Sequence, residues 1–171
     1  MSISQKLINF IEKRRSEVQK NQSGPFGDFW RNGGNDLLFD LPVKTGGLII
    51  DAGGYKGDWS AGMIARYGCR SEIFEPVPEF YNHCLKFFEK NKLVRVHGVA
   101  LGGNDRLTKF TFSDNGTSEH KNSIENFYID VKVMNIDRFF SESVSDKIDC
   151  FKMNIEGGEY ELIERLIESK K

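Results

Sequence analysis

Apolar and polar residues along the first part of the chain follow a rhythm that predicts an α/β fold. The apolar runs "LIID", "SEIFE" and "LVRVHGVAL", which begin at residues 48, 71 and 93, predict buried strands. Apolar stripes at helical spacing follow the first two strands: Trp59, Met63, Ile64 and Tyr67 before the C-cap Gly68, then Phe80, Tyr81, Cys84, Leu85 and Phe88 after Pro78. Because strands separated by helices require crossover connections, we expect a parallel sheet.

In the second part of the chain, apolar residues recur at every second position, which is the spacing of strands. The runs "LTKFTF" and "YIDVKVM" alternate apolar and polar residues and predict an inserted β-hairpin around a polar loop, 114–126. That loop is a candidate acceptor lid, with His120 and Ser123 as its reactive residues, or else a mobile surface loop. A short turn "NIDRFF" should lead to the strand "IDCFKMNI" and a last helix over 159–170, with a buried stripe of Leu162, Ile163, Leu166 and Ile167.

The N-terminal residues form a separate part of this organisation. Residues 3–20 have an apolar stripe at helical spacing and a basic cluster, Lys13 to Arg15, on what we expect to be a solvated face. The glycine-rich and aromatic segment "SGPFGDFWRNGG" then predicts an ordered loop. We therefore divide the chain into an N-terminal helix and connector, 1–34, and an α/β domain, 35–171.

Composition narrows the function classes. With 24 basic and 25 acidic residues, the chain has no charge excess that would favour nucleic acid or an anionic membrane. No apolar run approaches the ~20 residues of a membrane span, and the N-terminus lacks a signal-peptide layout. Three widely spaced cysteines predict reduced thiols in a cytoplasmic protein, and three scattered histidines without a Cys-x-x-Cys pair predict no metal site.

Candidate chemistry is concentrated in the turn after the first strand. Its pattern is Asp51-x-Gly53-Gly54-x-x-Gly57, in which glycines let the backbone pass under a ligand and the following helix offers free amides. Asp51 should point its charge into the crevice at the carboxyl ends of the strands. Glu75 ends the second strand, where a carboxylate can accept from both hydroxyls of a ribose. Alternatively, Asp51 is a helix N-cap and Glu75 a surface acid.

These two acids favour S-adenosylmethionine as the ligand over a nicotinamide dinucleotide. A carboxylate such as Asp51 is unfavourable beside a pyrophosphate but useful beside a cationic group. In addition, Ala52 replaces the first glycine of the dinucleotide fingerprint.

The chain from Asn35 to Lys171 resembles the FkbM-type family of S-adenosylmethionine-dependent methyltransferases. The likeness rests on the turn and on "IFEPVPEFYNHCLKFFEKN", "VHGVALGGNDRLTKF" and "IDCFKMNIEGGEYELIE". It implies a Rossmann-like three-layer sandwich and mostly O-methylation of hydroxyls on sugars and other natural products. It assigns the methionine end of the cofactor to Asp51, Gly53 and Gly57, the ribose to Glu75, and the adenine to the segment from Val99 through Ala100 to Leu101. Gly54, Pro76 and Asn154 are further candidates for contact with the cofactor.

The sequence departs from the family in one residue with chemical consequences. Asn154 stands where the family usually has Asp, and an amide cannot take a proton from an acceptor hydroxyl. Glu156 then becomes the best remaining base, with His97 or His120 as substitutes; a helix-terminal acid is its other interpretation. Lys152 alternates within its strand, and we expect it to pair with a neighbouring acid in a structural role.

The last departure concerns the sheet edge. The sequence pattern predicts four parallel strands and the inserted pair, but not the C-terminal strands that a methyltransferase sheet normally has. We therefore expect either a truncated chain or a partner, such as a second copy in a homodimer, at the open edge of the sheet. Three functions stay open: O-methyltransferase, non-catalytic S-adenosylmethionine-binding or interaction module, and nicotinamide-dependent oxidoreductase. Ala52 and Asp51 count against the last.

Overall fold

A computed structural model describes residues 25–113, 116–118, 127–142, 147–155 and 157–169. Its internal contacts divide the chain into two compact units, Met1–Leu41 and Pro42–Lys171. The first unit contains the short helices α2 (Pro25–Arg31) and α3 (Gly34–Leu37). The second unit contains every described strand, and all the site residues considered below belong to it. The helix expected over 3–20 lies outside the described residues.

The second unit is built on a four-stranded parallel sheet, as the sequence predicts. Its strand order is β3-β2-β1-β8, made of Val94–His97, Arg70–Phe74, Leu48–Ala52 and Cys150–Met153. In this sheet Asp51 lies opposite Ile73 of β2 on one side and Lys152 of β8 on the other. Strand β1 is buried along its whole length because it lies between two neighbours and under helices on both faces.

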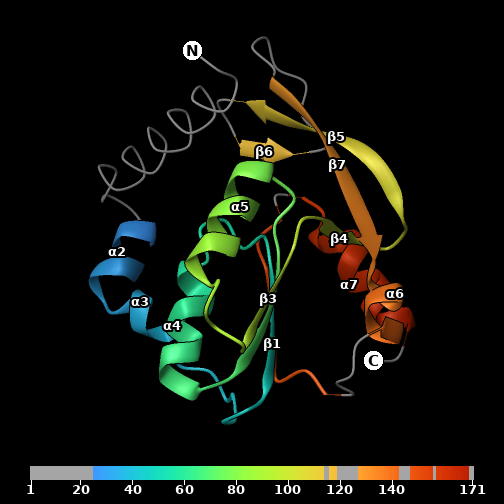
Figure 1. Ribbon diagram of the computed structural model, residues 1–171. Coiled ribbons are helices and arrows are strands. Elements are labelled where there is room, and N and C mark those ends of the chain that lie inside the picture. Colours follow the sequence, from blue (N-terminus) through green and yellow to red (C-terminus); the bar gives the residue numbers. More distant parts are fainter. Residues whose placement is uncertain (1–24, 114–115, 119–126, 143–146, 156, 170–171) are drawn as a thin grey trace. The chain divides into compact units, whose positions relative to one another are not determined.

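Helices cover the two faces of this sheet and give a three-layer sandwich (Figure 1). On one face lie α4 (Asp58–Tyr67) and α5 (Pro78–Phe87). Ala61 and Ile64 of α4, Cys84 of α5 and the adjoining Phe88 pack in one cluster with Ile73. On the other lie α6 (Ile136–Glu142) and α7 (Glu159–Glu168), whose Phe139 and Leu162 enter a core cluster with Phe74. The predicted ends of α4 and α5 are confirmed, since Gly68 caps α4 with φ 61° and Pro78 begins α5.

A second sheet contains the inserted hairpin. Strands β5 (Arg106–Ser113) and β7 (Phe127–Asn135) pair antiparallel, and β6 (Gly116–Ser118) and β4 (Ala100–Gly102) complete the order β4-β7-β5-β6. The single strand predicted over 93–101 is therefore wrong. Its first half pairs with β2, whereas its second half leaves that sheet and pairs with β7.

Two segments predicted as irregular are helices. The connector "SGPFGDFWRNGG" contains α2, which starts at a proline whose missing amide costs nothing in a first turn. The turn "NIDRFF" is the start of α6. There, the Asn135 side chain accepts a hydrogen bond from the Asp137 amide at 2.8 Å, and Ile136 and Phe139 are buried one turn apart.

Several residues of the predicted apolar stripes lie on the solvent-exposed side of their helices. Leu85 is 41% exposed, Ile163 40% and Ile167 72%, whereas Leu162 is fully buried. Apolar residues at three-to-four-residue spacing form a stripe along a helix that is wider than the part of the helix surface packed on the sheet. The residues at the edge of the stripe therefore remain exposed to solvent. No described helix is long and apolar enough to cross a membrane.

Candidate functional site

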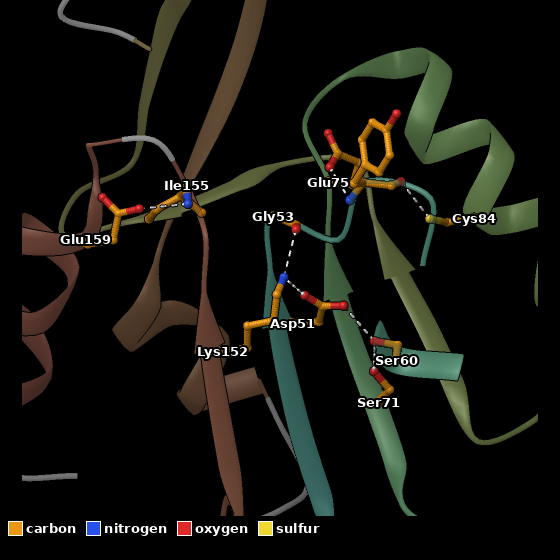
Figure 2. Close-up of polar contacts among 10 residues, drawn as sticks. Asp51, Gly53, Ser60, Ser71, Glu75, Cys84, Lys152, Ile155 and Glu159 are labelled. Atoms are coloured by element: carbon orange, nitrogen blue, oxygen red, sulfur yellow. Dashed lines mark hydrogen bonds and ion pairs between the residues drawn. The ribbon is translucent and has the colours of Figure 1, made fainter. Parts of the chain in front are cut away.

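The carboxyl ends of β2, β1 and β8 meet at one edge of the main sheet, where most of the predicted site residues gather (Figure 2). Glu75 directly follows β2, Asp51 lies near the end of β1, and Lys152 occupies the neighbouring position of β8. The turn from Gly53 to Gly57 connects β1 with α4 at the same edge. Ligands of open parallel sheets bind at this end.

The glycines of the turn are required by contacts within the protein. Gly53 has φ 82°, and a Cβ there would overlap the backbone carbonyl of Asn154 beyond β8. Gly57 has φ 84°, and a Cβ there would lie 2.6 Å from the ring of Phe88. The sequence predicts that these glycines allow a ligand to approach the backbone. The close approach of the segments that follow β8 and α5 is a sufficient reason for them.

The amides of the turn also point into the protein. Those of Gly53 and Gly54 both donate to the Phe74 carbonyl, at 2.9 and 3.2 Å, and the Gly57 amide donates to Gly54 at 2.8 Å. The amides of these three glycines are therefore bonded within the protein and are not available to a pyrophosphate. That the first amides of α4 are free, as expected from the sequence, stays a prediction.

Glu75 is the acid that the turn holds in place. It is 5% exposed, and its two oxygens each accept a backbone hydrogen bond: Oε2 from the Tyr55 amide at 2.7 Å and Oε1 from the Val77 amide at 2.9 Å. The alternative that Glu75 is a surface acid is wrong. Each carboxylate oxygen has a second lone pair, so both can still accept from a ligand.

Burial dominates the ionisation of Glu75. Loss of hydration raises its pKa to about 7, and the hydrogen bonds from the Val77 and Tyr55 amides offset part of that rise. A carboxyl group with a pKa near neutrality changes charge under ordinary conditions. Perturbed acids of this kind are typical of functional sites.

Asp51 is fully buried and faces protein partners, not an open crevice. Its Oδ1 accepts from Lys152 Nζ at 2.6 Å, and its Oδ2 accepts from Ser60 Oγ at 2.8 Å (Figure 2). Ser60 in turn lies 2.9 Å from Ser71 Oγ. The alternative role of Asp51 as an N-cap is also wrong, because Gly57 precedes α4 and no side chain caps that helix.

Lys152 is confirmed as the partner of an acid. Besides Asp51, its ammonium donates to the Gly53 carbonyl at 3.1 Å, and it lies 5.6 Å from the centre of the Trp59 ring. The lysine therefore ties β8 to β1 and to the start of the turn. The sequence indicated the pairing but not the second bond to the turn.

The end of β8 carries the predicted catalytic residues. Asn154 is exposed, and its backbone amide donates to the Ala52 carbonyl at 3.0 Å. Glu156 lies outside the described residues, but the positions beside it are held: Glu159 accepts from the Ile155 amide at 2.9 Å and from the Gly157 amide at 2.7 Å. No role for Glu159 was expected from the sequence. The sequence signal that could have identified it is an acid in the first turn of the last helix, a position from which such side chains bond upstream amides.

The other predicted residues within the described ranges have protein contacts of their own, and the His97 carbonyl accepts from the Glu75 amide at 3.0 Å. His97 Nε2 is 2.6 Å from Glu72 Oε2, and its ring stacks on Phe74 at 4.5 Å, on the sheet face that α6 covers. Ala100 and Leu101 are buried in hydrophobic clusters, and Pro76 is half-buried beside Glu75. Their contacts with an adenine stay a prediction. His120 and Ser123 lie outside the described residues.

Comparison with known families identifies this fold. The sequence model of the methyltransferase FkbM domain matches residues 51–170, which include the end of β1, all of β2 and β8, and every site residue named above. The chain belongs to the FkbM methyltransferase family. Members of this family are typically S-adenosylmethionine-dependent methyltransferases, so the resemblance stated from the sequence is confirmed. No curated protein matches the sequence.

Solved structures give short alignments to this FkbM domain. The cyclopropane synthase MmaA2 from Mycobacterium tuberculosis is 22% identical with a TM-score of 0.36, over 38% of this chain and 24% of that chain. A chain of the complex containing the Haloferax volcanii Trm112 methyltransferase activator is 18% identical with a TM-score of 0.34, over 42% of this chain and 32% of that chain. The aligned part is thus less than a third of either matched chain.

The donor and acceptor set fits S-adenosylmethionine. Glu75 has an anchored carboxylate that can accept from hydroxyl groups, and the amides of Gly53, Gly54 and Gly57 are bonded within the protein. The ligand has a ribose, a sulfonium and an amino-acid end, but no phosphate. Among the described residues no group of three or more His, Cys, Asp or Glu side chains could hold a metal ion.

Proposed function

We propose that this protein is an O-methyltransferase that acts on a hydroxyl group of a sugar or another small natural product. The observation that supports it most is the anchored, buried Glu75 at the strand tips, inside a domain of the FkbM methyltransferase family. The bonds that the amides of Gly53, Gly54 and Gly57 make within the protein count against the nicotinamide-dependent oxidoreductase, because those amides cannot also hold a pyrophosphate.

In this proposal the residues at the ends of different strands contact different parts of the cofactor. Glu75 accepts from the ribose hydroxyls, each charge-assisted bond contributing about 1.5–3 kcal/mol. The turn of Gly53, Gly54 and Gly57, with Asp51 beneath it, lies under the methionine end, and Pro76, Ala100 and Leu101 surround the adenine. When bound, S-adenosylmethionine supplies an electrophilic methyl group.

The acceptor hydroxyl needs orientation and, for full rate, a base. Asn154 is exposed at the tip of β8 and can hydrogen-bond the acceptor or the methionine end, but it cannot remove a proton. Glu156, two residues further along, is the proposed base, contributing about 10²–10⁴-fold to the rate. Glu159 accepts from the amides of the two residues that flank Glu156 in the sequence, Ile155 and Gly157.

Two measurements test this function. Calorimetry with S-adenosylhomocysteine should show micromolar binding that Glu75→Ala weakens at least tenfold, while the exposed-site control Glu89→Ala leaves it unchanged. Transfer of a labelled methyl group to a panel of sugars and phenols should then be lost in Glu156→Gln without loss of cofactor binding. Affinity that survives Glu75→Ala would contradict the proposal.

The presence of Asn154 in place of the family's acid favours a second candidate, a non-catalytic S-adenosylmethionine-binding or interaction module. Cofactor binding without methyl transfer to any tested acceptor, in wild-type protein and in Asn154→Asp, would support this module. Turnover that appears only in Asn154→Asp would show that the natural residue suppresses an otherwise complete site.

The open edge of the main sheet supports a proposal about the assembly state. Strand β8 pairs with β1, and among the described strands it has no neighbour on its other side. Since an open edge invites pairing, we propose that a second copy covers it in a homodimer, in a cytoplasmic protein. Light scattering coupled to size-exclusion chromatography should give twice the chain mass; a monomer at micromolar concentration would contradict it.

A further inference from the structure

We propose that Lys152, and not Asp51, contacts the carboxylate of the cofactor's methionine moiety. This inference rests on the proposed function, because it assumes that S-adenosylmethionine occupies the tips of β2, β1 and β8. It changes the role of Asp51 from a ligand contact to the buried partner that positions the lysine.

The first observation is the difference in exposure within the ion pair. The Asp51 side chain is 0% exposed, whereas the Lys152 side chain is 26% exposed. Both oxygens of Asp51 already bond protein groups, Lys152 Nζ and Ser60 Oγ. A ligand that reaches this place therefore meets the ammonium group before it meets the carboxylate.

The second observation concerns the hydrogens of that ammonium. A lysine ammonium has three donors. In the part of the chain that the structure describes, one donates to Asp51 Oδ1 and one to the carbonyl of Gly53, at the first residue of the turn. The remaining donor, on a partly exposed group directly below the turn, is suited to an anionic oxygen.

The third observation is the distance across the sheet. Glu75 follows β2, and Lys152 lies on β8, with β1 between them. Neighbouring strands lie about 5 Å apart, so the two groups are separated by about 10 Å along the edge of the sheet. A nucleoside whose ribose is held by Glu75 and whose amino-acid chain extends over β1 brings its carboxylate to the β8 side.

The surroundings of Lys152 make such a contact selective. The Trp59 ring lies 5.6 Å from Nζ and limits the hydration of the ammonium, which strengthens its bond to an anion. Asp51 neutralises the lysine when no ligand is bound, so the buried charge is compensated. Only an anion, and not the ligand's own ammonium, gains from the remaining donor.

The test compares two ligands that differ in the carboxylate alone. S-Adenosylhomocysteine and its decarboxylated analogue share the adenine, ribose, thioether and amine. By calorimetry on the full chain, wild-type protein should bind S-adenosylhomocysteine about 10- to 100-fold more tightly, as expected for one charged hydrogen bond. The double variant Asp51→Asn/Lys152→Met removes the pair without leaving a buried charge and should bind both ligands about equally.

Controls separate this inference from the function on which it rests. Lys86→Met removes an exposed lysine of α5 and should keep the wild-type preference, and Lys152→Arg, which keeps the charge, should retain part of it. Wild-type protein that binds both ligands equally would overturn the role of Lys152 while leaving the cofactor assignment intact. An undiminished preference in the double variant would do the same. Wild-type protein that binds neither ligand would overturn the cofactor assignment and this inference together.

Discussion

The amide of Tyr55 donates a hydrogen bond of 2.7 Å to Glu75 Oε2 from a left-handed backbone conformation, with φ 53°. Among the described residues other than glycine, Tyr55 alone has a positive φ. Such a conformation costs a non-glycine residue about 1–3 kcal/mol and persists where the surroundings enforce it. Here the Tyr55 ring packs on Phe80, with centroids 4.4 Å apart, and its carbonyl accepts from Cys84 at 3.1 Å. Side-chain packing thus keeps an unfavourable turn that aims an amide at the acid.

This relationship predicts an inverted order of stability for two truncations of Tyr55. Tyr55→Gly and Tyr55→Ala both delete the ring, but only alanine keeps the cost of a left-handed backbone. We expect the glycine variant to be the more stable of the two by about 1 kcal/mol, the reverse of their usual order. Urea denaturation of both variants measures the difference. An alanine variant as stable as the glycine variant would show that the backbone at this position carries no strain.

The framework of the fold follows from the sequence because it depends on local periodicity. The buried run at β1, the C-cap Gly68 and the helix start at Pro78 each combine a hydrophobic pattern with a residue that only certain backbone positions favour. The break of residues 93–101 into β3 and β4 was not predictable in this way. Both halves are apolar and extended, and only their pairing with different sheets separates them.

The sequence predicts which residues belong to the site better than it predicts what each of them contacts. The acids Asp51 and Glu75 could be located because each lies near the end of an apolar strand. Their orientations could not, because Asp51 is turned inward by Lys152, which lies 101 positions away in the chain. Likewise, the glycines of the turn serve contacts with Asn154 and Phe88 that no local pattern reveals.

A substitution at Gly53 tests that account of the turn. Gly53→Ala places a methyl group against the backbone carbonyl of Asn154, which cannot rotate away, so we expect overpacking to cost about 1–3 kcal/mol beyond the backbone strain. Gly46→Ala is the matched control, because Gly46 has φ 73° and a Cβ there would meet no atom within 4 Å. Thermal denaturation should show a small loss for the control and a larger one for Gly53→Ala. Equal losses would mean that β8 does not approach the turn as described.

The pKa of Glu75 predicts how cofactor affinity depends on pH. An ionised carboxylate accepts more strongly from ribose hydroxyls than a protonated one, and burial raises the pKa of Glu75 to about 7. The affinity for S-adenosylhomocysteine should therefore rise with pH up to and slightly beyond neutrality, then level off. In Glu75→Gln it should be weak and nearly independent of pH over the same range. Calorimetry between pH 5 and pH 8.5 distinguishes the two profiles.

The same group has the opposite effect on stability. Because its folded-state pKa of about 7 lies above the usual 4.5, the folded protein holds a proton between these pH values that the unfolded chain has lost. The contribution of Glu75 to the free energy of unfolding is thus full below pH 4.5 and falls as pH rises to 7, by about 3 kcal/mol in total. Urea titrations should show this loss in the wild type and its absence in Glu75→Gln. Parallel pH profiles for both proteins would contradict the raised pKa.

The ion pair of Asp51 and Lys152 predicts a large effect that a second substitution reverses. Lys152→Met leaves the fully buried Asp51 carboxylate with Ser60 as its remaining bond in the described part of the chain, and an uncompensated buried charge costs about 3–5 kcal/mol. Adding Asp51→Asn removes that charge, and the new amide oxygen can still accept from Ser60, so most of the loss should be recovered. Comparing the unfolding free energies of the wild type, both single variants and the double variant gives the coupling between the two residues. Losses that simply add would mean that the lysine and the acid act independently, and that the turn is not held by their pairing.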